Sequence, residues 1–253
     1  MSTTGKTTGR TTGKTTGKLI GSGRTADVYE IDDAWVLRRD REDWGDAAAE
    51  GAVMEHVRAY GYPVPRVRPG DSLTSRTDLV MERLTGPTML EALAAGSIGL
   101  REAGTVLAAL LRQLHTIPGR RPGTRVLHLD LHPENVMLTP TGPRVIDWGT
   151  AEDGDPGLDW GLSAIILAQV AVDDQPIADP ARAVLAALLA DPADLTEVGL
   201  AEARRRRAVN PTMTPREVEL LGAAEELVRS LAFPPQDGVR RGVPRDEGNR
   251  EST

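Results

Sequence analysis

The chain has 253 residues, enough for one large domain or two lobes that share a cleft, and 40% of them are hydrophobic and 26% charged. This composition is that of an ordinary globular protein in solution. The net charge of −7 argues against nucleic acid as the main partner, and the lack of cysteine excludes disulfides and thiolate zinc sites. The longest weakly polar run, residues 161–172, is too short for a membrane span, so we expect a cytoplasmic protein with no membrane partner.

The two ends of the chain differ in composition from its centre. Residues 1–17 repeat the sequence Thr-Thr-Gly-Lys/Arg with no apolar residue after Met1, which predicts a disordered tail. Its glycines recur every four residues, so the phosphate-binding pattern G-x-x-x-x-G-K-[ST] is absent. Residues 235–253 are polar and rich in Gly and Pro, and we expect a second flexible tail there.

From residue 18 the pattern predicts a small β-rich lobe. Strands are expected over 18–20, 27–31 and 35–39, separated by the turn sequences Gly-Ser-Gly-Arg and Asp-Asp. Asp46 can cap a helix that runs to about Tyr60. Two more strand-like segments follow, over 64–67 and 78–83.

After Gly86 the pattern becomes helical. Leucines and valines recur at helical spacing over 100–116, and a short β region surrounds residues 128–147. Further helices are expected over 157–172, 178–190, 195–208 and 215–232, the last starting at a capping box of Thr214 and Glu217. Strands first and helices afterwards indicate an α+β protein of two lobes, 18–84 and 85–234, with a hinge near 82–86.

The strongest functional signal is the run His-Leu-Asp-Leu-His-Pro-Glu-Asn at residues 128–135, with Val-Ile-Asp-Trp-Gly at 145–149. Asp130, Asn135 and Asp147 then stand at the spacing that a phosphoryl-transfer site requires. Such a site needs a carboxylate to orient a hydroxyl and accept its proton, and oxygen ligands to hold Mg²⁺ against phosphates. The alternative interpretation of the three residues is a polar loop followed by a core strand.

On these residues the chain resembles the protein-kinase-like superfamily, and most closely its bacterial aminoglycoside phosphotransferase branch. The resemblance implies a protein-kinase-like two-lobe fold, with a small N-terminal antiparallel β lobe that holds one helix and a larger, mostly helical C-terminal lobe. It implies that Asp130 is the catalytic residue and that Asn135 and Asp147 are the metal ligands. His128 and His132 are interpreted as scaffold residues of the loop. Asp159, the last acid of the run Asp-Pro-Gly-Leu-Asp, would brace that loop.

The resemblance also implies a nucleotide site in the N-terminal lobe. Glycines in a turn between strands let the backbone approach phosphates, although a plain hairpin turn is the alternative. Side chains alternate between the two faces of a strand, so Val36 and Arg38 lie on the same face. The resemblance then implies that Arg38 stands where the family has a phosphate-binding lysine, and Arg39 is the other candidate. Glu50, or else Glu55, would orient that cation. The predicted cofactor-binding residues are Gly21, Ser22, Gly23, Val28, Val36, Arg38, Glu50 and Glu82.

The acceptor is expected to be a small molecule that bears a hydroxyl. Only eleven residues separate Asp147 from Asp159, which leaves no room for the activation segment of a protein kinase, and no Ala-Pro-Glu follows. Acids at positions 152, 153, 155, 173 and 174 are either contacts for a cationic acceptor or a solvated rim. Arg204–Arg207 are interpreted as a solvated helix face.

The sequence therefore predicts a phosphotransferase that uses ATP or GTP with Mg²⁺ and acts on a small-molecule hydroxyl, as a monomer or dimer. The alternatives are a nucleotide-binding pseudokinase or scaffold and a protein kinase.

Overall fold

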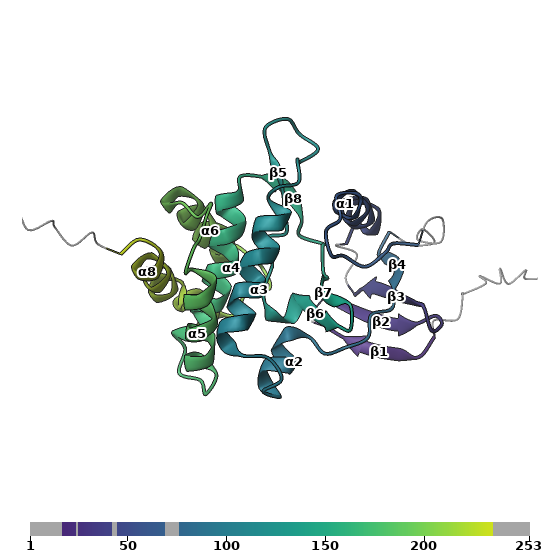
Figure 1. Cartoon of the computed structure of the whole chain (residues 1–253), viewed down its shortest axis with the longest axis horizontal. Coiled ribbons are helices and arrows are strands. Elements are labelled where there is room, and N and C mark those ends of the chain that lie inside the picture. The colour runs from purple at the N-terminus through teal and green to yellow at the C-terminus, as the bar shows by residue number, and fades with distance from the viewer. Residues whose placement is uncertain (1–16, 24, 42–44, 69–75, 235–253) are drawn as a thin grey trace, which may run out of the picture.

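The computed structural model of the chain describes residues 17–23, 25–41, 45–68 and 76–234. A β-rich lobe and a helical lobe lie side by side (Figure 1). The N-terminal lobe holds a four-stranded antiparallel sheet in the order β1-β2-β3-β4 and one helix. Its elements are β1 (Leu19–Ser22), β2 (Ala26–Glu30), β3 (Trp35–Asp40), α1 (Ala47–Ala59) and β4 (Asp78–Glu82). Apart from Gly17, the two predicted tails lie outside the described residues.

The predicted start and end of the first helix are confirmed. The side chain of Asp46 accepts a hydrogen bond from Ala49 N at 3.1 Å, and the helix gives way to a cap at Tyr60. The strand predicted over 64–67 is wrong, because only Val67 forms an isolated bridge, to Met81. Prolines at positions 63 and 65 lack the N–H that a strand ladder needs.

The C-terminal lobe contains two short antiparallel ribbons and a helical bundle. Its helix α2, six residues long and not predicted, starts at a capping box formed by Thr88 and Glu91. The helix predicted over 215–232 is divided into two at Leu220, although the predicted capping box at Thr214 is present. The elements are α2 (Met89–Ala94), α3 (Leu100–Leu114), β5 (Arg125–Leu127), the 3₁₀ turn η1 (Pro133–Asn135), β6 (Val136–Thr139), β7 (Gly142–Val145), β8 (Glu152–Gly154), α4 (Pro156–Ala171), α5 (Ala178–Leu188), α6 (Glu197–Ala208), α7 (Pro215–Glu219) and α8 (Leu221–Ala232).

Helix α4 is the centre of the C-terminal lobe. Almost all of its residues are buried, because α5, α6 and α8 pack around it. Close contact with α6 depends on Gly161, where an added Cβ would lie 2.9 Å from the side chain of Ala203. The first turn of α4 thereby carries Asp159 into the interior, directly beneath the loop that follows β5.

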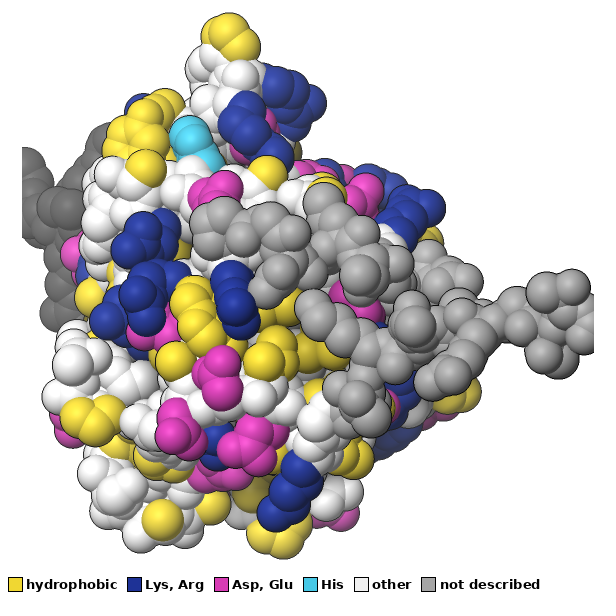
Figure 2. Space-filling model, turned by 90° about the vertical axis from the view of Figure 1, so that its right-hand side faces the viewer, with side chains coloured by type: hydrophobic (Ala, Val, Ile, Leu, Met, Phe, Trp, Pro, Cys, Tyr) yellow, Lys and Arg dark blue, Asp and Glu magenta, His cyan; other side chains and the backbone are white. Residues whose placement is uncertain are grey.

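The outer end of the N-terminal lobe carries several separate groups of basic side chains with acidic and hydrophobic side chains between them (Figure 2). Ion pairs of this lobe include Arg39 with Asp78 and Arg83 with Glu30. None of the helices in the described residues is both long enough and apolar enough to cross a bilayer.

Candidate active site

The register of the N-terminal sheet places the predicted nucleotide-binding side chains on one face. Val28 pairs with Arg38 across β2 and β3, and Glu30 pairs with Val36, so all four project from the same side. Gly21 pairs with Val28 and lies on that face as well. The predicted common face of Val36 and Arg38 is therefore confirmed.

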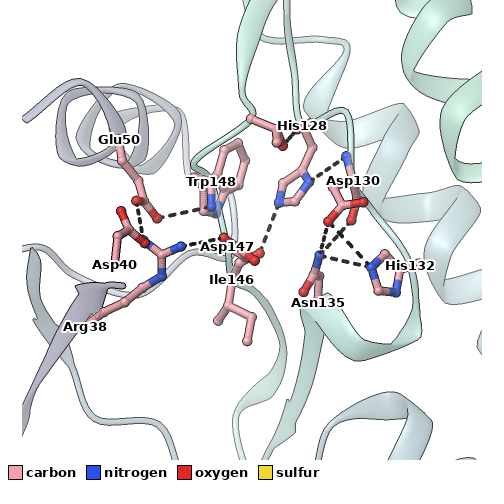
Figure 3. A network of polar contacts seen from close by, with 11 residues as sticks. Arg38, Asp40, Glu50, His128, Asp130, His132, Asn135, Ile146, Asp147 and Trp148 are labelled. Carbon is pink, nitrogen blue, oxygen red and sulfur yellow. Dashed lines mark hydrogen bonds and ion pairs between the residues drawn. The ribbon is translucent and has the colours of Figure 1, made fainter. Parts of the chain in front are cut away.

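Arg38 is the centre of an acidic cluster that joins the two lobes (Figure 3). Its Nη1 donates to Glu50 Oε2 at 2.8 Å, and its Nη2 donates to Asp147 Oδ1 at 2.9 Å. Asp40, two residues further along β3, places Oδ1 at 3.1 Å from the same Nη1. The Arg38 residue is only 8% exposed, so one buried guanidinium is shared by three carboxylates.

The geometry selects Arg38 and Glu50 over the alternatives considered for each. Arg39 projects from the opposite sheet face and pairs with Asp78 at 2.6 Å. Glu55 is exposed on α1, whereas Glu50 is buried. Glu50 therefore is the acid that contacts the β3 arginine.

Glu50 also contacts the C-terminal lobe directly, because its Oε1 accepts a hydrogen bond from Trp148 N at 3.2 Å. Burial raises the pKa of Glu50 to about 7, since the positive charge of Arg38 only partly offsets it and the carboxylates of Asp147 and Asp40 add to it. The Glu50 carboxyl thus takes up a proton more readily than a solvated glutamate would.

Asp130 and Asn135 face each other within the loop of residues 128–135, the candidate catalytic loop, which is called the catalytic loop below. Asn135 Nδ2 donates to the backbone oxygen of Asp130 at 2.8 Å and to its Oδ2 at 3.1 Å, and His132 Nε2 lies 3.3 Å from the same amide nitrogen. Burial raises the pKa of Asp130, but the hydrogen bond to His132, aided by the positive charge of Arg207, outweighs it and holds that pKa below its ordinary value. Asp130 is thus a carboxylate at neutral pH.

The ring of His128 links the catalytic loop to the segment that carries Asp147. Its Nδ1 accepts from Asp130 N at 3.3 Å, and its Nε2 lies 3.0 Å from the backbone oxygen of Ile146 (Figure 3). Burial lowers the pKa of His128, so a neutral ring that accepts at Nδ1 and donates from Nε2 satisfies both contacts. The scaffold role predicted for His128 is confirmed.

Asp159 anchors the same loop from below. Its Oδ1 accepts from Leu129 N at 2.7 Å, and its Oδ2 accepts from His128 N at 2.9 Å and from the His115 ring at 3.0 Å. Leu129 has φ of 66°, a left-handed conformation that costs a leucine free energy and needs such restraint. The bracing role of Asp159 is confirmed. His115 was not predicted, because a single histidine at the end of an amphipathic helix carries no distinguishing pattern.

Two predicted side chains point away from this cluster. Ser22 Oγ donates to Asp27 Oδ1 at 2.9 Å on the opposite sheet face, so only its backbone can serve a ligand under the glycine turn. Glu82 Oε2 accepts from Arg66 N at 3.0 Å. Gly23 closes the turn itself, with its N–H 2.8 Å from Ala26 O.

Four of the five acids weighed as contacts for a cationic acceptor have internal partners. Asp174 is exposed, whereas the others bond within the C-terminal lobe: Glu152 with Arg206 at 2.7 Å, Asp153 with Arg120 N at 2.9 Å, Asp155 with Gly157 N at 2.8 Å, and Asp173 with Arg216 at 2.9 Å. The arginines at 204–207 likewise contact neighbours, namely Glu225, Glu202, Glu152 and Gln169.

The model of the phosphotransferase enzyme family matches residues 16–125 and 120–198, a span that includes the predicted nucleotide face, the catalytic loop and Asp147. The chain belongs to the phosphotransferase enzyme family. No curated protein matches it. The match to the family model confirms the resemblance to the aminoglycoside phosphotransferase branch, and the activity of the family is phosphoryl transfer.

Solved structures of aminoglycoside phosphotransferases have the same fold as this chain. A thermostable mutant of the aminoglycoside phosphotransferase APH(4)-Ia, in a ternary complex with ADP and hygromycin B, is 13% identical with a TM-score of 0.52, over 84% of this chain and 93% of that one. The complex of APH(2″)-IIa with gentamicin is 14% identical with a TM-score of 0.52, over 83% of this chain and 90% of that one. These similarities confirm the predicted α+β fold of two lobes.

Proposed function

We propose that this phosphotransferase moves the γ-phosphoryl group of Mg²⁺-bound ATP or GTP to a hydroxyl of a small molecule. The observation that carries the proposal is the contact between the lobes, in which Arg38 of the N-terminal lobe bonds Asp147 of the C-terminal lobe at 2.9 Å, while within the C-terminal lobe Asn135 bonds Asp130 at 3.1 Å. The sequence separation between Arg38 and Asp147 is 109 residues, so only the fold brings them together.

The donor set fits a magnesium ion. Asn135 uses its amide nitrogen to bind Asp130, and its Oδ1 has no hydrogen-bond partner among the described residues. The Asp147 side chain is 39% exposed and presents oxygen, the donor that hard Mg²⁺ prefers. No group of three or more His, Asp or Glu in the described ranges could hold a metal by itself, so waters and phosphate oxygens would complete the shell. When bound, Mg²⁺ would neutralise charge on the phosphates.

The remaining roles follow from position and ionisation. Asp130 is 30% exposed, so a hydroxyl can reach it, and its low pKa keeps it ready to orient that hydroxyl and accept the proton. Arg38 presents a forked guanidinium to the face shared with Val28 and Val36, where phosphates would lie beside Asp147. Glu50 holds that guanidinium in place.

Asp130→Asn and Asp147→Ala test the proposal. With Mg²⁺ and ATP or GTP, Asp130→Asn should lower the rate of phosphoryl release by about 10²- to 10⁴-fold while nucleotide affinity persists. Asp147→Ala should lose the Mg²⁺-dependent part of nucleotide affinity. Glu55→Gln, at an exposed position on α1, is the matched control and should change neither quantity. Equal hydrolysis by Asp130→Asn and the unmodified protein would favour the pseudokinase alternative.

A further inference from the structure

Arg38 carries one positive charge, yet three carboxylates share it. Glu50 on α1 accepts from its Nη1 at 2.8 Å, and Asp147 of the C-terminal lobe accepts from its Nη2 at 2.9 Å. Both acids have a task in the proposed function, because Glu50 holds the guanidinium and Asp147 offers oxygen to Mg²⁺. The third acid is Asp40, whose Oδ1 forms an ion pair with the same Nη1 at 3.1 Å. An acid with no task of its own in phosphoryl transfer therefore contacts the arginine of the nucleotide face.

The surroundings of Asp40 hold its carboxylate in place. Asp40 lies two residues after Arg38 on β3, so both side chains project from the sheet face that also carries Val28. The backbone N–H of Asp40 donates to Thr77 O at 3.1 Å. Gly45, just before α1, packs against the carboxylate, since an added Cβ at that glycine would overlap Asp40 Oδ2. Only 11% of the Asp40 side chain is exposed, so salt in the solvent screens its ion pair little.

Asp40 and Glu50 restrain Arg38 from different elements. They lie on one side of the guanidinium, and Asp147 lies on the other (Figure 3). Glu50 belongs to α1, whereas Asp40 belongs to the strand that carries Arg38 itself. Two carboxylates at Nη1 fix the plane of the guanidinium, whereas Glu50 alone would let it pivot about a single hydrogen bond. Nη2 therefore stays directed toward Asp147, where the phosphates are proposed to lie.

The use of a second carboxylate follows from the chemistry of arginine. A lysine ammonium is a compact point charge with three rotating donors, so its orientation matters little. A guanidinium is planar, and it binds phosphate with two donors only when its plane is correctly oriented. The negative charge of Asp40 also repels phosphates, so an acid at this position with no effect on Arg38 would weaken nucleotide binding.

Resting on the proposed function, we propose that Asp40 is a positioning residue for nucleotide binding, which orients the guanidinium of Arg38 toward the phosphates. Asp40 acts through its contact with Arg38 and not by touching the nucleotide. The gain in affinity from the oriented guanidinium exceeds the loss that the negative charge of Asp40 causes by repelling the phosphates.

The direction of the change in one variant tests the proposal. Asp40→Asn keeps the shape of the side chain and removes its charge. In the full chain with Mg²⁺ and ATP or GTP, the dissociation constant of the nucleotide should rise about tenfold, as expected when a charge-assisted contact is lost. Asp33→Asn, in the exposed turn between β2 and β3, makes the same change in net charge and should leave that constant unchanged. Tighter or unchanged nucleotide binding by Asp40→Asn would overturn the proposal.

A double-mutant cycle separates this positioning role from a general loss of structure. A lysine at position 38 has no guanidinium plane to orient, so in the Arg38→Lys background Asp40→Asn should change the dissociation constant by less than about twofold. An equal tenfold loss in both backgrounds would show that Asp40 acts independently of Arg38 and would overturn the proposal. Urea denaturation of each variant checks that the protein is folded. A lack of nucleotide binding by the unmodified protein would count against the proposed function instead.

Discussion

Removal of the Asp159 carboxylate should destabilise the protein and disorder its catalytic loop. Asp159→Ala leaves three buried donors without their acceptor, on His128, Leu129 and His115. Each unpaired buried donor costs about 1–3 kcal/mol, and relaxation of the loop recovers part of that. We therefore expect a loss of about 3–5 kcal/mol in the free energy of unfolding, the range for breaking a buried charged contact.

Urea denaturation at neutral pH measures this loss, with an unchanged slope showing that the unfolded state is the same. Asp155→Ala is the matched control on the same helix turn, because it removes one bond, to Gly157 N, and should cost about 1 kcal/mol. A loss below about 1 kcal/mol for Asp159→Ala would refute the argument, because even one orphaned donor exceeds it.

The same variant should change the response to acid. Hydrogen bonds from His115 and the loop outweigh the effect of burial and hold the pKa of Asp159 below its ordinary value of 3.8. The folded protein therefore keeps this carboxylate charged to a lower pH than the unfolded chain does. The resulting stability is present above pH 3.8 and is lost as the pH falls further. The difference between the unmodified protein and Asp159→Ala should narrow in that acid range.

Three further predictions concern other parts of the molecule. Because the pKa of Glu50 is raised from 4.5 to about 7, its protonation stabilises the folded protein fully below pH 4.5, and this contribution is lost as the pH rises through about 7. In Glu50→Gln the free energy of unfolding, measured by urea denaturation, should therefore change less with pH across that window, and the same pH dependence in both proteins would contradict the assignment. Arg38→Lys keeps the charge but cannot bond Glu50 and Asp147 with one fork, and we expect the KM for nucleotide to rise about tenfold, whereas an unchanged KM would show that phosphate binding does not need the forked guanidinium. Thr214→Ala removes a capping bond and should lower the free energy of unfolding by about 1 kcal/mol, with no change in KM.

The parts of the site that could be predicted depend on short-range spacing. Asp130 and Asn135 belong to one loop, and Val36 and Arg38 belong to one strand with period two. The same alternation along β3 places Asp40 on the face of Arg38, although the sequence analysis did not predict a role for Asp40. In each of these cases local geometry decides which way a side chain points.

The parts that could not be predicted depend on partners remote in sequence. Glu152 meets an arginine 54 positions away, and only the packing of α6 against β8 determines that contact. His115 lies 44 residues from Asp159, and neither residue carries a sign of the other. Composition shows how many charged residues the chain has, but only the three-dimensional structure shows which of them form ion pairs.

The imidazole of His128 has a consequence for how the two substrates of the proposed reaction affect each other's binding. It joins Asp130 N to the carbonyl of Ile146, so it offers a direct path of coupling between the loop that carries Asp130 and the segment that carries Asp147. Thermodynamic linkage makes such a coupling reciprocal: whatever factor the metal nucleotide adds to acceptor affinity, the acceptor must add to nucleotide affinity. Binding curves for either ligand, recorded with and without the other, should then be displaced by the same ratio.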